Sequence, residues 1–108
     1  MIYRVAYTSE ARQDLRDIYT YIAEKLIAPE TAERQVHRIM DAADALEEMP
    51  LRFSLCEFEP WRSQGLRFVP VDNYILFYML KEVTDTVYIV RIMYAGRDIR
   101  RQFEETLY

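Results

Sequence analysis

The sequence predicts an α+β domain in which a hairpin of two helices packs on one face of a small, mostly antiparallel sheet. Two observations support this. A segment of alternating polarity is followed by two apolar stripes at helical spacing, and three apolar runs separated by turn residues come later. The predicted order is strand, helix, helix, irregular loop, three strands and a C-terminal helix. With 108 residues, of which 51% are apolar, we expect one domain spanning 1–108.

The first half of the chain supplies one strand and the two helices. Residues 1–7 alternate with the period of a strand, whose place in the sheet stays open. Thr8-Ser9 offers a helix N-cap, and Pro29 suits the first turn of a second helix, which Pro50 ends just after Met49. The stripes that should face the sheet are Ala11, Leu15, Ile18, Ile22 and Leu26 in the first helix, and Ala32, Val36, Ile39, Ala43 and Leu46 in the second.

Three strands are expected at 66–71, 74–80 and 87–94, with the apolar middle run as the central strand. Asp72-Asn73 tolerates the positive φ angles of a tight hairpin turn. Arg91 is the single charge in the third run. It either lies on a half-exposed face, pairs with a nearby carboxylate, or belongs to a binding surface on the sheet face that the helices leave open. The final segment, 97–107, should form a helix that docks Ile99, Phe103 and Leu107.

The sequence around the candidate catalytic and metal-binding residues gives little support for such roles. The loop 51–64 has no clean period, and we interpret it as irregular with an aromatic anchor, so Glu57 and Glu59 are better explained as solvated than as an acid/base pair. His37 lies beside its helical stripe, which favours a solvated or capping role. Cys56 is expected to be a small packing residue. We therefore predict no metal site and no cofactor.

The net charge of −4 argues against strong non-specific binding to nucleic acid, because that affinity comes mostly from phosphate contacts. No apolar run approaches the length of a membrane span and no signal peptide precedes the first strand, so we expect a cytoplasmic protein with no membrane contact. The predicted buried cluster includes Leu15, Ile18, Ile22, Val36, Ile39, Leu46, Leu76, Tyr78, Val90 and Ile92.

Seven short segments occur in an order that is typical of one family. They are 3–8, Ala11 with Asp14-Leu15, 21–23, Pro50 after Met49, 65–67, Asn73-Tyr74 with Phe77-Tyr78, and 90–94 leading to 96–99. Through them the chain resembles the RelE/ParE superfamily of bacterial toxins from type II toxin–antitoxin systems, over nearly its full length. The resemblance implies the RelE/ParE-like fold described above, and a toxin of a plasmid-stabilisation-like system that a cognate antitoxin neutralises.

The branches of this superfamily differ in target. RelE-like members are ribosome-dependent mRNA endonucleases and typically carry an arginine at the second position of a Tyr-Arg-aliphatic-x-Tyr run, where this chain has Ile75. Isoleucine cannot stabilise a phosphorane. The spacing of Arg91, Ile92, Arg97, Asp98 and Ile99 looks like the ParE branch, whose members inhibit DNA gyrase and often have a histidine where this chain has Tyr94.

The resemblance thus implies growth inhibition through gyrase, without enzymatic activity. The implied target-binding residues are Arg67, Arg91, Tyr94, Arg97, Asp98, Arg100 and Arg101. Two alternatives stay open. A RelE-like endoribonuclease acting on ribosome-bound mRNA would use Arg67, Arg91, Tyr94 and Arg97, and a non-toxic member would act only as a binding partner. An antitoxin is the expected protein partner in each case, and a homodimer is compatible with the sequence.

Overall fold

The computed structural model describes residues 2–96 and 98–106 and confirms the α+β architecture. Four strands form one sheet in the order β1-β4-β3-β2. The edge strand β1 (Arg4–Tyr7) runs parallel to β4 (Thr86–Tyr94), whereas β3 (Tyr74–Lys81) pairs antiparallel with β4 and with β2 (Arg67–Val71). This order places the N-terminal strand, which the sequence left open, and confirms the middle apolar run as a central strand.

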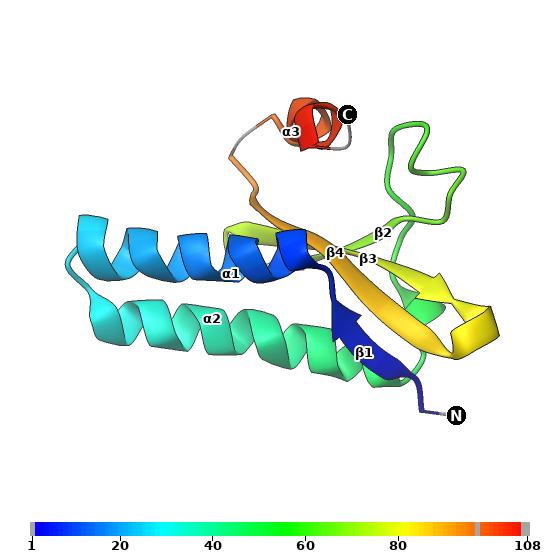
Figure 1. Ribbon diagram of the computed structural model, residues 1–108, viewed down its shortest axis with the longest axis horizontal. Helices are drawn as coiled ribbons and strands as arrows, with labels where there is room; N and C mark the ends of the chain where they lie inside the picture. Colours follow the sequence, from blue (N-terminus) through cyan, green and yellow to red (C-terminus); the bar gives the residue numbers. More distant parts are fainter. Residues whose placement is uncertain (1, 97, 107–108) are drawn as a thin grey trace.

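The two helices of the hairpin lie side by side on one face of the sheet (Figure 1). Helix α1 (Ser9–Thr20) is capped by Thr8, whose hydroxyl accepts a hydrogen bond from the Ala11 amide, as the predicted N-cap requires. Helix α2 (Pro29–Asp44) begins at the predicted proline. It ends earlier than expected, because a 3₁₀ turn (Ala45–Glu47) continues it and Met49 then adopts a positive φ of 50°.

The end of the first helix departs from the predicted stripe at Leu26. After α1 the chain forms a π-helical turn (Tyr21–Lys25), in which the amide of Leu26 bonds to the carbonyl of Tyr21 five residues back. This wider turn rotates the following residues away from the sheet. Leu26 is consequently 57% exposed instead of buried, and Ile27 in the link that follows is 84% exposed.

The hairpin and the sheet enclose the first core cluster. Its buried members from the predicted list are Ile18, Ile22, Ile39, Leu46, Leu76, Tyr78 and Ile92, while Leu15 and Val36 are half-buried against it. Val90 is the exception. The β3–β4 register steps from Phe77 opposite Arg91 to Tyr78 opposite Ile89, so a β-bulge leaves Val90 without a partner and turns it to the other face of the sheet.

That other face is not left open, which corrects the expectation of an uncovered binding surface. Helix α3 (Ile99–Thr106) and the irregular segment before β2 lie over it, as Figure 1 shows. The second core cluster comprises the buried residues Cys56, Trp61, Leu66, Phe77, Met93 and Phe103, with Ile99 packed against it. The docking of Ile99 and Phe103 is confirmed, whereas Leu107 lies outside the described residues.

Candidate functional site

Arg91 is held inside the fold by a carboxylate of α1. Strand β1 ends opposite Ile89, so the edge of β4 beyond that point has no neighbouring strand. Asp14 takes its place. Its Oδ2 accepts the Ile92 amide at 2.8 Å and the Arg91 Nε at 2.7 Å, and its Oδ1 accepts the Arg91 Nη2 at 2.9 Å. The two side chains are only 14% and 11% exposed, so this bidentate pair is well shielded from water.

The position of Asp14 in the sequence of α1 is an indication of this pair that the apolar stripe of the helix does not contain. Asp14 lies three residues after Ala11 and four before Ile18, both of which are buried, so the carboxylate shares the sheet-facing side of α1. An acid at such a position needs a buried partner. The local-carboxylate explanation of Arg91 is therefore confirmed, with Asp14 as the carboxylate.

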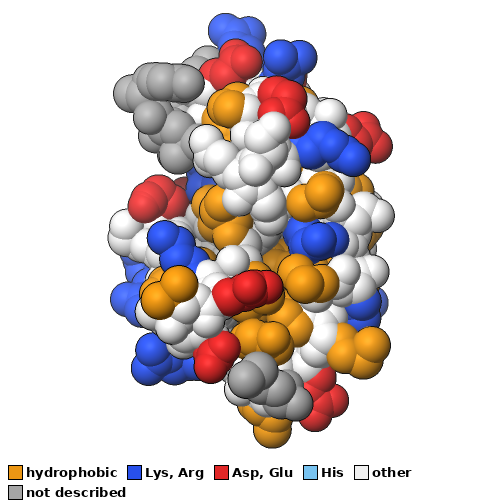
Figure 2. Space-filling model, turned by 90° about the vertical axis from the view of Figure 1, so that its right-hand side faces the viewer, with side chains coloured by type: hydrophobic (Ala, Val, Ile, Leu, Met, Phe, Trp, Pro, Cys, Tyr) orange, Lys and Arg blue, Asp and Glu red, His pale blue; other side chains and the backbone are white. Residues whose placement is uncertain are grey.

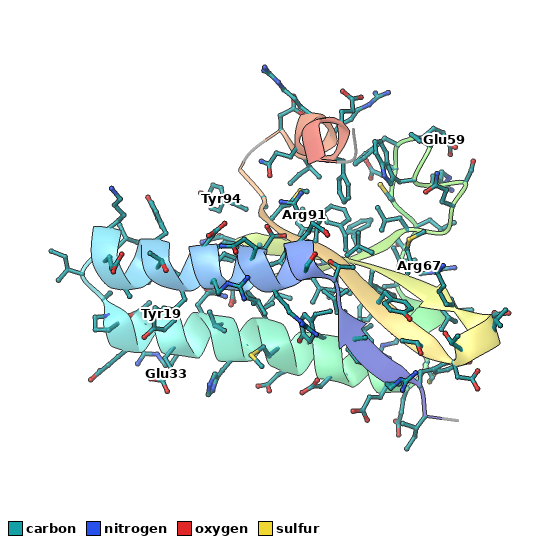
Figure 3. The ribbon with its side chains drawn as sticks, viewed as in Figure 1. Tyr19, Glu33, Glu59, Arg67, Arg91 and Tyr94 are labelled. Carbon is teal, nitrogen blue, oxygen red and sulfur yellow. The ribbon has the colours of Figure 1, made fainter. Side chains whose placement is uncertain are left out.

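Arg67 and Arg91 lie on opposite faces of the sheet. Residues directly opposite each other on paired strands project from the same face. Arg67 is opposite Tyr78, which belongs to the hairpin core, whereas Arg91 is opposite Phe77, which belongs to the second core. Figure 3 shows Arg67 toward the far end of the sheet from Tyr94. The structure therefore does not bring Arg67, Arg91 and Tyr94 into one pocket.

Arg67 also contributes to the anchoring of the segment that follows α2. Its Nη1 donates to the Phe53 carbonyl at 2.5 Å, and the Tyr78 hydroxyl donates to the Pro50 carbonyl at 2.5 Å. Arg52 folds back in the same region and donates to the carbonyls of Glu48 and Met49. These guanidinium groups bind main-chain oxygens, which gives them a structural role.

Tyr94 lies at an exposed aromatic corner where β4 ends. The residue is 48% exposed, and its ring meets the Tyr74 ring edge-on, with centroids 5.8 Å apart. A Cβ at Gly96 would lie 2.5 Å from Cε2 of Tyr94, so any larger residue there would displace the Tyr94 ring. Burial, and next the neighbouring Tyr94 and Tyr21, raise the pKa of Tyr74. Tyr94 is thus partly exposed to solvent while the Tyr74 ring supports it from one side.

The remaining predicted site residues belong to the start of α3. Asp98 is exposed and caps the helix through a hydrogen bond from the Arg101 amide to its Oδ1 at 3.2 Å. Arg100 is exposed and forms an ion pair with Glu104, with Nε 3.6 Å from Oε1. Arg101 is exposed as well. Arg97 lies outside the described residues. The exposed cations of the predicted set that the structure describes are therefore those of α3.

The sequence-based interpretations of His37, Glu57, Glu59 and Cys56 agree with their burial. His37, Glu57 and Glu59 are exposed, in agreement with the solvated interpretations. Cys56 is buried, and burial is the main cause that raises the pKa of its thiol. Within 2–96 and 98–106, no group of three or more His, Cys, Asp or Glu residues is arranged to hold a metal ion. Likewise, none of the helices in these ranges is both long and apolar enough to span a membrane.

Two tyrosines, the half-buried Tyr7 and the buried Tyr78, give the fold a predicted alkaline limit. Burial is the main cause that raises the pKa values of Tyr7 and Tyr78 to about 12, from 10.0. Because the fold favours the neutral phenols, their contribution to stability is complete below pH 10 and is lost as the pH rises toward 12. We expect ultraviolet titration of tyrosinate to show a late phase that Tyr7→Phe and Tyr78→Phe each reduce. Normal titration of all nine tyrosines in protein that stays folded would contradict this.

The two substitutions should differ in stability. The Tyr7 hydroxyl is buried and without a hydrogen-bond partner among the described atoms, so Tyr7→Phe should leave the free energy of unfolding unchanged or raise it. Tyr78→Phe removes the bond to Pro50 and should cost about 1–2 kcal/mol, measured by urea denaturation.

Comparison with known proteins identifies relatives over most of the chain. The family model for the ParE toxin of the type II toxin–antitoxin system parDE matches residues 5–99. No curated protein sequence matches.

Solved structures of toxins from such systems have a similar fold. The chromosomal ParDE system of P. aeruginosa aligns with a TM-score of 0.71 and 23% identity, over 86% of this chain and 96% of that chain. The RelBE2 complex of Mycobacterium tuberculosis gives 0.67 and 22%, over 90% and 95%. A doubly mutated E. coli RelE in the free state gives 0.66 and 12%, over 100% of both chains.

Proposed function

Because this chain belongs to the ParE toxin family of type II toxin–antitoxin systems, we propose that it inhibits growth by binding DNA gyrase and that a cognate antitoxin neutralises it. The observation that carries the choice of target is the absence of a convergent cationic site among the residues that the structure describes. Cleavage of RNA through its 2′-hydroxyl needs cations around the phosphorane and a group that moves the proton. Inhibition by binding needs only a surface.

The positions of the candidate nuclease residues support this choice. Ile75, which replaces the arginine of the nuclease branch, is half-buried and packs against the second core cluster. Arg67 donates to a main-chain carbonyl, and Arg91 is paired with Asp14. His37 is on α2, in the hairpin layer and away from the face that α3 covers. The target surface that we propose is accordingly Tyr94 together with the exposed arginines of α3.

The tip of the helical hairpin is the surface that we propose for the antitoxin. Its exposed large apolar residues are Tyr19 at 42%, Tyr21 at 54%, Leu26 at 57% and Ile27 at 84%. Such a patch suits the apolar face of a partner helix. Strand addition at β2 is less suitable. Residues 54–56 already bond to part of its outer edge, and Pro70 offers no amide hydrogen there.

The gyrase proposal is tested with purified protein and a relaxed plasmid. We expect inhibition of supercoiling, reduced about tenfold or more by Arg100→Ala combined with Arg101→Ala, because both cations are exposed on the proposed target surface. Arg16→Ala combined with Arg34→Ala is the matched control, since these exposed arginines belong to the hairpin. Ribosome-dependent cutting of mRNA with gyrase unaffected would instead establish the RelE-like alternative.

The antitoxin proposal is tested separately by co-expression with the product of a neighbouring small open reading frame, followed by affinity purification. Tyr21→Ser combined with Leu26→Ser should release the partner, because these substitutions remove exposed apolar area without touching the core. Retention of the partner by this variant, and its loss on substitution in the β1 edge, would locate the antitoxin elsewhere. Absence of toxicity with the partner retained would favour the non-toxic alternative, whereas absence of both toxicity and any such partner would contradict the toxin–antitoxin proposal.

A further inference from the structure

An apolar depression lies at the end of the molecule away from the hairpin tip. It is lined by Tyr3, Met49, Pro50, Leu51 and Arg52, which come from the start of β1 and from the segment that follows α2. Figure 2 shows this end of the molecule, with hydrophobic side chains gathered in the lower centre of the view. In Figure 1 the link between α1 and α2 is at the left, whereas this segment is at the right.

Two of the apolar residues that line the depression are largely exposed. Met49 is 72% exposed and Leu51 is 51% exposed, and both line it. Met49 also has a left-handed backbone conformation, with φ 50°, in which glycine or asparagine is more common than methionine. The flexible, polarisable Met49 side chain is therefore exposed to solvent at a cost in backbone strain. Methionine is frequent on surfaces that bind protein segments.

A second depression continues from the first and carries an unfavourable excess of acidic charge. Its lining adds Asp44, Glu47 and Glu48 to the shared Met49 and Arg52, so three acidic residues and one arginine line it. Arg52 directs donors to the carbonyls of Ala45, Glu48 and Met49 rather than outward.

Asp44 is the last residue of α2, and Glu47 and Glu48 follow it closely. The helix dipole disfavours anions at this end, and no basic residue occupies the last turn. Within the described residues, no ion pair involves any of the three carboxylates. A cation from a partner would relieve this repulsion.

We propose that this joint depression is a docking site for a protein segment that carries an apolar side chain next to lysine or arginine. The apolar side chain would lie against Met49 and Leu51, and the cation would face Glu47 and Glu48. The charge complementarity selects a basic segment over an acidic one or a nucleic acid. The site is separate from the hairpin tip and from α3, so the chain can hold this partner together with an antitoxin or a target.

The probe is a synthetic amphipathic peptide of leucine and lysine, compared with a peptide of the same pattern in which glutamate replaces lysine. Binding to the full chain is measured by fluorescence anisotropy, and its location by amide chemical shifts. We expect only the lysine peptide to bind, with shifts centred on Tyr3, Met49 and Leu51. Met49→Ser combined with Leu51→Ser should weaken binding about tenfold or more, whereas Val83→Ser, at a residue that is 99% exposed on another turn, should not.

The charge contribution has its own matched pair of variants. Glu47→Gln combined with Glu48→Gln should weaken the lysine peptide and flatten the dependence of its affinity on salt, because those carboxylates provide the attraction. Glu30→Gln combined with Glu33→Gln, at the other end of α2, should change neither. Equal binding of the glutamate peptide, shifts centred on the hairpin tip, or a dimer of this chain that Met49→Ser dissociates would each overturn the proposal. None of these results bears on gyrase inhibition.

Discussion

Replacing Asp14 with alanine should lower the free energy of unfolding by about 3–5 kcal/mol, because it leaves the Arg91 side chain, which is only 14% exposed, without its carboxylate partner. The Ile92 amide on the edge of β4 loses its acceptor in the same variant. Urea denaturation followed by circular dichroism measures the effect. Asp17→Ala is the matched control, since Asp17 is an exposed acid on the same helix whose side chain bonds only to Gln13 in the described structure. Its cost should stay below about 1 kcal/mol.

The partner substitution completes a double-mutant cycle. Arg91→Ala alone should cost a similar amount, and the double variant should cost much less than the sum of the two single variants, because the remaining charge is then absent. Additive costs would show that the two side chains do not act as a pair. The cycle also bears on function. A loss of toxicity in Arg91→Ala is evidence of a target contact only if the variant is shown to remain folded.

The elements of the fold could be predicted because their signals are local. The stripes of α1 and α2, the cap at Thr8 and the turn at Asp72, whose φ is 55°, each depend on a few neighbouring residues. The π-helical turn could not be predicted, because the same stripe continues through Tyr21–Lys25 and only the hydrogen-bond pattern changes. The bulge that turns Val90 outward depends on the register of two strands, which periodicity within one strand does not contain.

The candidate site was harder to predict than the fold, for a physical reason. Sequence shows that Arg67 and Arg91 are cations within strands but not which face each occupies after pairing. Their partners, the Phe53 carbonyl and the Asp14 carboxylate, are 14 and 77 residues away along the chain. The second core was hard to predict for the same reason. The aromatic residues of 51–64 have no period, yet Trp61 meets Phe103 from the other end of the chain. Long-range contacts of this kind follow from topology.

Phe103→Ala should produce the second large effect, about 3–5 kcal/mol, because it creates a cavity at the centre of the cluster that attaches α3 to the sheet. The Phe103 side chain is fully buried, and its ring centroid lies 4.8 Å from that of Phe77, 5.3 Å from that of Trp61 and 6.0 Å from that of Phe58. A helix of eight residues has little stability of its own, so α3 depends on this contact.

Two measurements show where the energy is lost. Trp61, the single tryptophan, is 5% exposed, and its fluorescence should shift to the red in Phe103→Ala before urea is added if α3 leaves the sheet. Limited proteolysis should then cut within 98–106 while the hairpin stays protected. Arg100→Ala provides the comparison, because Arg100 is exposed on the same helix and should leave both measurements unchanged. An unshifted spectrum, with a cost below about 1 kcal/mol, would mean that the loop and sheet aromatics close the second core without α3.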